Sequence, residues 1–377
     1  MIKAQWQEDS MLKKFSVENF KGFQSKFVLD LSRPGNYAFN PECVKNGIVS
    51  KAAIYGINGI GKSNLGLAIF DIVTHLTEKY RPLNKYTNYL NLDGSKPYVY
   101  FEYVFQFENN TLVYKYAKQS LNTLIEESLS INDKEMLYYD FRENKGFSNF
   151  LGSETLDLSS NSSNSRVKYI MGTALLKADN LENTVLSQFK EFVENMLLFY
   201  SLRENEFIGF RQDVSFLDKL IIDANKVQDF ENFINAQGLK IKLVVVNSPE
   251  GKKIYFQHKH GLTYYFNECS TGMVSLILLY SWLIQIEKCS FVYIDEFDAF
   301  YHYELAEMIV KELKKFKDVQ IIVTTHNTDL LNNDLMRPDC YFVLTEEKID
   351  SLNRLTEKDL RLAHNLQKLF KSGAFNE

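Results

Sequence analysis

The chain has 377 residues, of which 45% are apolar and 24% charged, a balance typical of a globular protein with ample core material. Its net charge of −5 argues against a protein that coats nucleic acid through overall basicity, so any such contact would need a local basic patch. The apolar runs fall well short of the ~18 residues needed to span a bilayer, and the first ten residues lack the apolar core of a secretory signal. The four cysteines show no C-x-x-C spacing, which fits a reducing compartment. We therefore expect a cytoplasmic protein without a membrane-spanning segment.

The first elements predicted in chain order are strands. Alternating apolar and polar residues over 12–31 predict two strands joined by a tight turn, and residues 48–55 predict a buried strand that ends at Gly56. A helix is expected to begin near Lys62, where apolar residues take up helical spacing. Further alternation predicts an antiparallel meander over residues 98–107, 111–118, 125–131 and 136–140.

The middle of the chain carries weaker patterns. The polar tract 159–165 predicts a flexible loop, and the apolar spacing over 174–200 and 215–236 indicates helices. Strands are expected at 241–246 and 253–257.

A parallel sheet and a terminal helix are predicted for the rest. Residues 270–345 alternate helix and strand, which is typical of a parallel sheet. The last helix is expected to begin at a capping box formed by Thr356 and Asp359, and to end at Gly373.

Residues 56–63 form the clearest motif of the chain. They read Gly-Ile-Asn-Gly-Ile-Gly-Lys-Ser and match G-x-x-x-x-G-K-[ST] at each fixed position, between a predicted strand and a predicted helix. The glycines let backbone N–H groups turn inward around phosphates, and the helix N-terminus favours negative charge. Lys62 is expected to reach the β- and γ-phosphates, and Ser63 to bind Mg²⁺.

An acidic pair follows a second buried strand. Residues 291–296 read Phe-Val-Tyr-Ile-Asp-Glu. In a phosphate-binding protein of this kind, Asp295 is expected to hold Mg²⁺ and Glu296 to accept a hydrogen bond from the attacking water.

Two further motifs flank the acidic strand. Ser270 and Gly272 stand at the start of an apolar helix, where a hydroxyl and free N–H groups can bind phosphate, although such a triplet also serves as an ordinary helix cap. His326 ends the buried strand 320–325. A lone histidine there is more often structural, but beside the other motifs it is a candidate to contact the γ-phosphate.

Together these motifs resemble the ABC-type ATPase heads of the SMC, RecF and double-strand-break-repair group, as does the opening pattern over residues 17–23 (Val-Glu-Asn-Phe-Lys-Gly-Phe). The resemblance implies an α/β P-loop NTPase fold with a mixed β-sheet and a helical insertion between the phosphate loop and the signature motif. It divides the chain into an N-terminal ATPase lobe (1–140), a mainly helical insertion (141–240) and a C-terminal ATPase lobe (241–377).

The same resemblance assigns roles to the site residues. It implies that ATP is bound by residues of the phosphate loop and, across a head-to-head dimer or higher even oligomer, by the signature motif: Asn58, Gly59, Gly61, Lys62, Ser63, Asn64, Ser270 and Gly272. Ser63 and Asp295 would bind Mg²⁺, Glu296 would be the catalytic base and His326 the switch histidine. Asp298 would belong to the loop that crosses the dimer interface.

The phosphate loop, the signature triplet and the tail 369–375 are also similar to ATPases of bacterial phage-defence operons, namely relatives of the overcoming-lysogenization-defect family and the partners in abortive-infection and PARIS-type systems. The chain is too short after Asp295 for an appended nuclease domain of that family. The resemblance therefore implies a separately encoded nuclease or toxin effector, with a phage protein or DNA as trigger.

Other functions stay open from the sequence alone. They are a DNA-binding repair ATPase like RecF, the nucleotide-binding subunit of a transporter, and a self-contained nuclease. A run of lysines at 311–317 predicts a solvated helix face, with nucleic-acid contact as the alternative.

Overall fold

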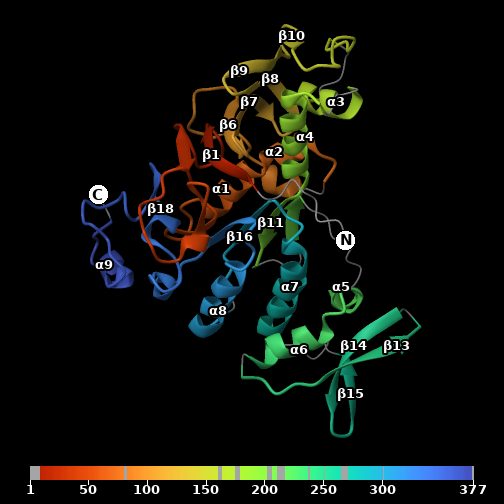
Figure 1. Ribbon diagram of the computed structural model, residues 1–377, viewed down its shortest axis with the longest axis vertical. Coiled ribbons are helices and arrows are strands. Elements are labelled where there is room, and N and C mark those ends of the chain that lie inside the picture. Colours follow the sequence, from red (N-terminus) through yellow and green to blue (C-terminus); the bar gives the residue numbers. More distant parts are fainter. Residues whose placement is uncertain are drawn as a thin grey trace.

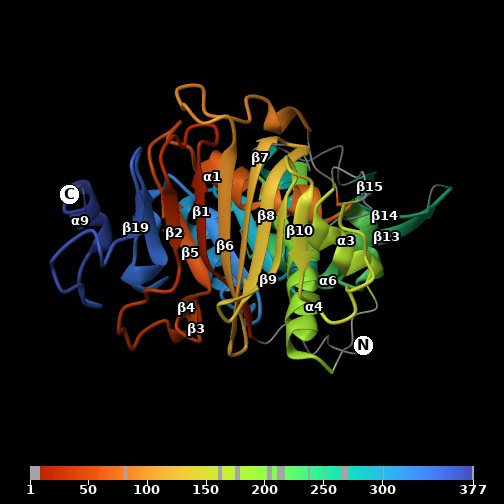
Figure 2. The ribbon, with the colours of Figure 1, turned by 90° about the horizontal axis from the view of Figure 1, so that it is seen from above.

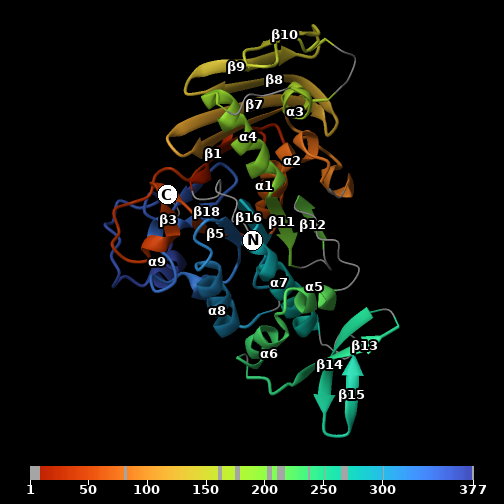
Figure 3. The same ribbon diagram turned by 45° about the vertical axis from the view of Figure 1, so that its right-hand side comes forward.

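The computed structural model describes residues 9–79, 83–159, 164–174, 179–201, 206–209, 217–236, 238–249, 251–264, 271–299 and 301–375. Two seven-stranded sheets form two layers of the molecule, and helices pack between them (Figure 1). A smaller three-stranded sheet projects from the end opposite the outer sheet (Figures 1 and 3).

The central sheet has the strand order β12-β11-β16-β17-β5-β18-β19. Five neighbouring strands, β11 to β18 in that order, are parallel, whereas the two edge strands are antiparallel to them. The strands are β5 (Lys51–Tyr55), β11 (Met196–Tyr200), β12 (Glu206–Gly209), β16 (Phe291–Asp295), β17 (Gln320–Thr324), β18 (Tyr341–Leu344) and β19 (Ile349–Ser351). Every residue of the five parallel strands is buried, as expected for a sheet covered on both faces. This mixed sheet confirms the predicted α/β fold class.

The outer sheet is antiparallel throughout, with the order β10-β9-β8-β7-β6-β1-β2 (Figure 2). Its strands are β1 (Ser10–Glu18), β2 (Phe27–Asp30), β6 (Val99–Phe107), β7 (Asn110–Ser120), β8 (Thr123–Ile131), β9 (Lys134–Asp140) and β10 (Lys145–Ser148). The predicted meander is therefore confirmed and continues by one strand. Alternate residues of β6 are buried, because only one face of the sheet packs on helices.

The remaining elements complete the body of the molecule. The helices are α1 (Lys62–Ile69), α2 (Asp71–Leu76), α3 (Arg166–Thr173), α4 (Leu181–Glu194), α7 (Thr271–Ile286), α8 (Tyr303–Leu313) and α9 (Leu366–Lys371). A short hairpin consists of β3 (Val44–Lys45) and β4 (Ile48–Val49), and four single turns of 3₁₀-helix cover Pro41–Cys43, Leu83–Tyr86, Thr328–Leu330 and Pro338–Cys340.

A buried ion pair joins α2 to the outer sheet. Asp71 and Lys118 are both fully buried, and Lys118 Nζ lies 2.7 Å from Asp71 Oδ1. The hydroxyls of Tyr116 and Tyr89 donate to the same carboxylate, at 2.9 and 2.7 Å. Losing one partner would leave a buried charge without compensation, so the four side chains hold α2 in one position against β7.

Two predicted helices differ from the structure. Residues 174–200 are not one helix, since their last five form β11 in the centre of the sheet. An uninterrupted apolar run such as Met-Leu-Leu-Phe-Tyr has no period that separates a buried strand from a buried helix.

The last helix does not begin at Thr356. Its cap is Asn365, whose side chain accepts from Lys368 N at 2.8 Å, whereas its predicted end is confirmed by Gly373 with φ 80°.

An arm extends from the body (Figures 1 and 3). We use this name for α5 (Leu217–Asp223), α6 (Val227–Asn235), β13 (Leu243–Ser248), β14 (Gly251–His258) and β15 (Gly261–Tyr264). The arm has a small core of its own, in which Ile221, Phe230 and Ile254 pack with Ile277 and Tyr280 of α7. The division of the chain at residues 140 and 240 stays a prediction, and the polar tract 159–165 lies mostly outside the described residues.

Helix α1 lies unusually close to the central sheet at Gly66. A Cβ atom added to this glycine would lie 2.8 Å from Tyr293 Cε1 and 3.0 Å from Leu198 Cδ1. Gly66→Ala is therefore expected to lower the free energy of unfolding by about 1–3 kcal/mol, because a well-packed core must shift to admit the methyl group. Chemical denaturation measures this change.

Gly172→Ala is the matched control. Gly172 is also helical, and an added Cβ there would meet no atom within 4 Å. Alanine at this position should stabilise the protein by up to ~1 kcal/mol. Equal effects of the two substitutions would contradict the close packing of α1.

Candidate functional site

The phosphate loop lies between β5 and α1, as the motif predicts. Two of its glycines have left-handed backbone conformations, Gly59 with φ 81° and Gly61 with φ 112°. Other residue types adopt such angles at a cost, so the loop depends on glycine at both places. Gly61 is also the N-cap of α1, which begins directly at Lys62. The unpaired backbone N–H groups of the first helical turn therefore lie next to the loop, where they can bind phosphate.

The side chain of Lys62 folds over this loop. Its ammonium donates to Gly56 O at 2.9 Å and Ile57 O at 3.3 Å, and lies 3.3 Å from His326 Nδ1. Burial lowers the pKa of Lys62, and the nearby carboxylates of Glu296 and Asp295 oppose that shift. The cation is thus placed at the loop with two acidic groups near it.

Ser63 and Asp295 come together although they are far apart in sequence. Ser63 Oγ donates to Asp295 Oδ2 at 2.5 Å, and Thr324 Oγ1 donates to Asp295 Oδ1 at 2.9 Å. Burial raises the pKa of Asp295, which is 5% exposed, while the two hydroxyl contacts lower it. The charge of Lys62 also lowers the pKa of Asp295, so a cation lies near this carboxylate. A hydroxyl beside a buried carboxylate offers a suitable pair of oxygen ligands for Mg²⁺.

Glu296 and His326 form the second pair. His326 Nε2 lies 3.2 Å from Glu296 Oε1, and His326 Nδ1 lies 3.1 Å from Gly56 O. The backbone of Glu296 is left-handed, with φ 48°, and its N–H donates to Thr324 Oγ1 at 2.7 Å. This uncommon conformation turns the chain at the end of β16 and is typical of a residue held for function.

A cavity of about 370 Å³ opens beside these side chains. It is lined by residues of the predicted site and by others that sequence analysis missed: Lys21, Ser63, Asn64, Leu67, Asn84, Lys85, Tyr200, Asp295 and Glu296. Lys85 Nζ lies 4.3 Å from the ring centroid of Tyr200, a cation–π contact. Burial lowers the pKa of Lys21, and the charge of Lys85 lowers it further. Two lysines therefore line the same cavity as the acidic pair.

The missed residues differ in the signal that the sequence offered. Lys21 lies inside the opening pattern 17–23, so it could have been included. Tyr200 was assigned to a helix, and its position beside Asp295 follows only from the pairing of β11 with β16. Lys85 lies in a 3₁₀ turn without a motif. Thr324 looked like a residue of a buried strand, and its contact with both acidic residues required the fold.

The signature motif is described only in part. Gly272 lies in the first turn of α7, whereas Ser270 lies outside the described residues. Asp298 accepts from Thr325 Oγ1 at 2.7 Å, and burial raises its pKa. The roles of these residues across a dimer stay predictions.

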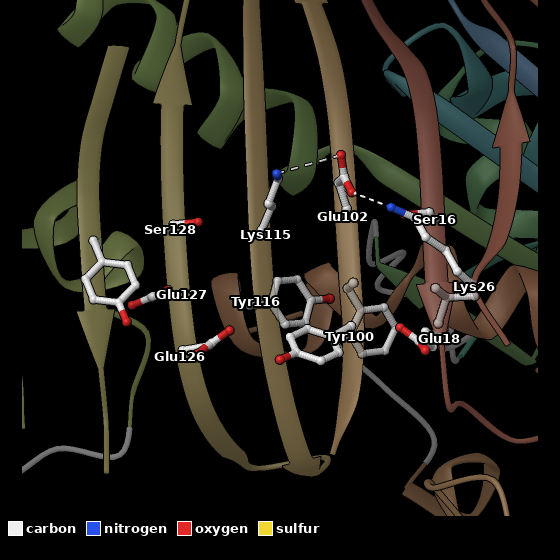
Figure 4. A pocket seen from close by; sticks show the side chains of 13 residues that line it. Ser16, Glu18, Lys26, Tyr100, Glu102, Lys115, Tyr116, Glu126, Glu127 and Ser128 are labelled. Carbon is white, nitrogen blue, oxygen red and sulfur yellow. Dashed lines mark hydrogen bonds and ion pairs between the residues drawn. The ribbon is translucent and has the colours of Figure 1, made fainter. Parts of the chain in front are cut away.

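A second hollow, of about 300 Å³, lies on the outer sheet (Figure 4). Tyr100, Glu102 and Lys115 line its floor, and none of the lining residues belongs to the phosphate loop. Glu102 is paired with Lys26 at 3.1 Å and with Lys115 at 4.0 Å. The charged side chains that line the hollow therefore compensate one another. We assign no role in nucleotide binding to this hollow.

The raised pKa of Asp295 makes stability depend on pH. A carboxyl group whose pKa is higher in the folded state favours folding when neutral, so its ionisation destabilises the protein as pH rises through that pKa. Asp295→Asn is therefore expected to raise the unfolding temperature at pH 7, without nucleotide or Mg²⁺, by on the order of 2–4 °C. The gain should shrink as the pH falls toward 4. Thermal unfolding between pH 4 and 8 measures both effects.

Asp334→Asn is the control, because Asp334 is exposed and the same substitution there should leave the unfolding temperature nearly unchanged. An Asp295→Asn protein no more stable than the unmodified chain at pH 7 would contradict the effect of burial.

Similar solved structures include the SMC head domain from Thermotoga maritima, 16% identical, with 91% of this chain and 99% of that chain covered and a TM-score of 0.44. A Smc head domain with an extended coiled coil, bound to the C-terminal domain of ScpA and derived from Pyrococcus furiosus, is 15% identical, with 91% and 96% covered and a TM-score of 0.46.

No curated protein matches the sequence. Among the described residues, no helix combines the length and apolarity that crossing a membrane requires. One family model matches residues 51–332, more than half of the chain and the stretch that runs from β5 past His326. The chain therefore belongs to the P-loop ATPase family described as "AAA domain, putative AbiEii toxin, Type IV TA system".

Proposed function

We propose that this protein is a Mg²⁺-dependent ATPase that works as a head-to-head pair and controls a separate toxic effector in bacterial defence against phage. The observation that carries the proposal is the meeting of Ser63, Asp295, Glu296 and His326 beside the phosphate loop. Three motifs from distant parts of the sequence supply these groups, and a hydrolytic site of this kind uses each of them.

The roles follow from the positions of the side chains. Backbone N–H groups of the loop and the ammonium of Lys62 would bind the phosphates of ATP. Ser63 and Asp295 would hold Mg²⁺, which neutralises charge that develops on the transferred phosphoryl group. Glu296 would accept a hydrogen bond from the attacking water and His326, 3.2 Å away, would position its carboxylate. Lys21 and Lys85 add positive charge to the lining of the cavity.

The paired state is proposed from the signature motif. Ser270 and Gly272 would bind the γ-phosphate held by the opposite subunit, so that each site is complete only in a dimer or a higher even oligomer. Such an arrangement makes the oligomer respond to whether ATP is present, which is what a switch requires.

The defence role is proposed from the family and the resemblance of the motifs. The family description names a toxin and a toxin–antitoxin system. We propose that this chain is a cytoplasmic regulatory subunit, that the toxic activity belongs to a nuclease or other effector encoded separately, and that a phage protein or DNA is the trigger.

The catalytic assignment predicts the behaviour of Glu296→Gln. The amide should keep ATP binding but no longer activate water, so turnover should fall by at least about 100-fold. The trapped ATP should also shift the protein toward an even-numbered assembly. Phosphate release and light scattering after gel filtration, with and without Mg-ATP, measure the two effects.

Glu304→Gln is the control, because Glu304 is an exposed residue in the first turn of α8. Normal turnover in Glu296→Gln would refute the role of Glu296. A monomer that binds ATP without changing mass would reduce the proposal to a P-loop ATPase that works alone.

The defence role predicts a requirement for nucleotide binding in cells. Bacteria that carry the gene with its neighbouring genes should resist phage, and Lys62→Ala should raise the efficiency of plating by at least about tenfold. Plaque counts on matched strains measure this. Equal counts for the Lys62→Ala and unmodified genes would contradict a defence role that depends on ATP, and the Glu304→Gln gene serves again as the control.

A further inference from the structure

The sheet of the arm is strongly basic, unlike the chain as a whole. Residues 238–264 contain five lysines and two histidines but a single glutamate, whereas the full chain has a net charge of −5. The lysines are Lys240, Lys242, Lys252, Lys253 and Lys259. We call β13, β14 and β15, together with residues 240–242 and 259–260, the basic sheet. It projects from the body at the far end from the outer sheet (Figure 3).

The basic groups gather at the ends of the strands. Lys252 and Lys253 follow the turn between β13 and β14, and Lys259 occupies the turn between β14 and β15. The backbone N–H of Gln257 donates to the carbonyl of Lys242 at 2.8 Å. The lysines that precede β13 therefore lie near the turn between β14 and β15. Lys240, Lys242, Lys252 and Lys259 are exposed. Positive charge therefore lies at both ends of β14.

Aromatic rings lie between these cations on one face. Tyr255 pairs directly with Tyr264, with ring centroids 5.6 Å apart, and Lys253 Nζ lies 5.3 Å from the ring of Tyr264. The neighbouring residue Ile254 points to the other face, where it is fully buried in the small core of the arm. Strand alternation places Lys253 and Tyr255 on the face opposite Ile254, which we call the tyrosine face, whereas Lys252 has the same orientation as Ile254 near the end of the strand. Tyr255 and Tyr264 are half-buried, and Tyr264 also packs against the small core of the arm.

We propose that the tyrosine face of the basic sheet, with the lysines at its ends, binds single-stranded nucleic acid. Lysines at the ends of an extended surface match the phosphates of a strand, and a tyrosine ring on a sheet stacks with an unpaired base. A duplex would offer phosphates but no exposed base face for Tyr255. The inference goes beyond the proposed function, because it assigns a ligand to a surface outside the nucleotide site.

The lysine run that begins on α8 is held in closer ion pairs than the basic sheet, where Lys242 lies 3.9 Å from Glu231 and remains exposed. Lys311 lies 2.5 Å from Glu307, Lys315 lies 2.5 Å from Glu312, and Lys314 lies 2.7 Å from Glu42. These ion pairs compensate the charge of the run locally. Lys311 is exposed on α8, whereas Lys314 lies at the C-cap with a side chain that is 10% exposed, so only part of the run is the solvated helix face that the sequence predicts. Substitutions in the run therefore provide a control with the same change in net charge.

The test measures binding of a fluorescent 30-nucleotide single strand by anisotropy, at several salt concentrations. Replacing Lys252, Lys253 and Lys259 together by glutamine should weaken binding at least tenfold and lower the slope of log Kd against log salt by about 2, since each strand phosphate contributes about 0.7. Tyr255→Leu should weaken binding about tenfold without changing that slope. The control triple K311Q/K315Q/K317Q should bind as the unmodified protein does.

The outcomes separate the alternatives. Absence of salt-dependent binding by the unmodified protein, or an equal loss in the control triple, would overturn the proposal. A duplex of equal length bound as tightly as the single strand, with no effect of Tyr255→Leu, would refute the single-strand assignment. Tighter binding of a polyglutamate peptide than of the oligonucleotide would indicate an acidic protein partner instead. ATP turnover and thermal unfolding of each variant show that the body remains folded, so failure here is distinct from failure of the ATPase assignment.

Discussion

The close approach of α1 to the central sheet is the constraint on which the site depends. Gly66 has no side chain, so α1 reaches Tyr293 of β16, and the hydroxyl of Tyr293 donates to Lys62 O at 2.7 Å. The first turn of α1 and the end of β16 are thereby fixed at one separation. The contact between Ser63 and Asp295, residues far apart in the sequence, follows from that separation. A helix held further from the sheet would leave the serine hydroxyl and the carboxylate unable to share one metal ion.

Thr324 extends the same constraint to a third strand. Its hydroxyl donates to Asp295 and accepts from the N–H of Glu296, so one side chain of β17 orients the last residue of β16 and the acidic residue directly after it. Because β5, β16 and β17 are parallel neighbours, their carboxyl ends meet at one edge of the sheet. The cost of burying Asp295 in this place lowers the stability of the free protein and leaves a carboxylate ready for a cation. If Asp295 holds Mg²⁺ as proposed, stability is traded for metal affinity at this residue.

Much of this architecture is visible in the sequence, and the rest is hidden for identifiable reasons. The strand that leads to Gly56, the loop 56–63 and the acidic strand each carry a local pattern, so they could be predicted without a fold. β11 could not, since its five apolar residues are compatible with either type of secondary structure. Lys85 and Tyr200 belong to the site only because β11 pairs with β16 and a 3₁₀ turn passes nearby. Pairings between distant segments leave no trace in a single sequence.

Helix α7 is apolar on both sides because it serves two cores. Leu276, Leu279 and Trp282 pack into the body, while Ile277 and Tyr280 face the small core of the arm. The arm is therefore built on a helix whose other side already belongs to the ATPase body. Such a junction is suited to exchange in evolution: an insertion of different shape can occupy this place if it presents an apolar patch to Ile277 and Tyr280. ATPases with one body could in this way acquire different recognition modules, and the arm seen here would be one member of an interchangeable set.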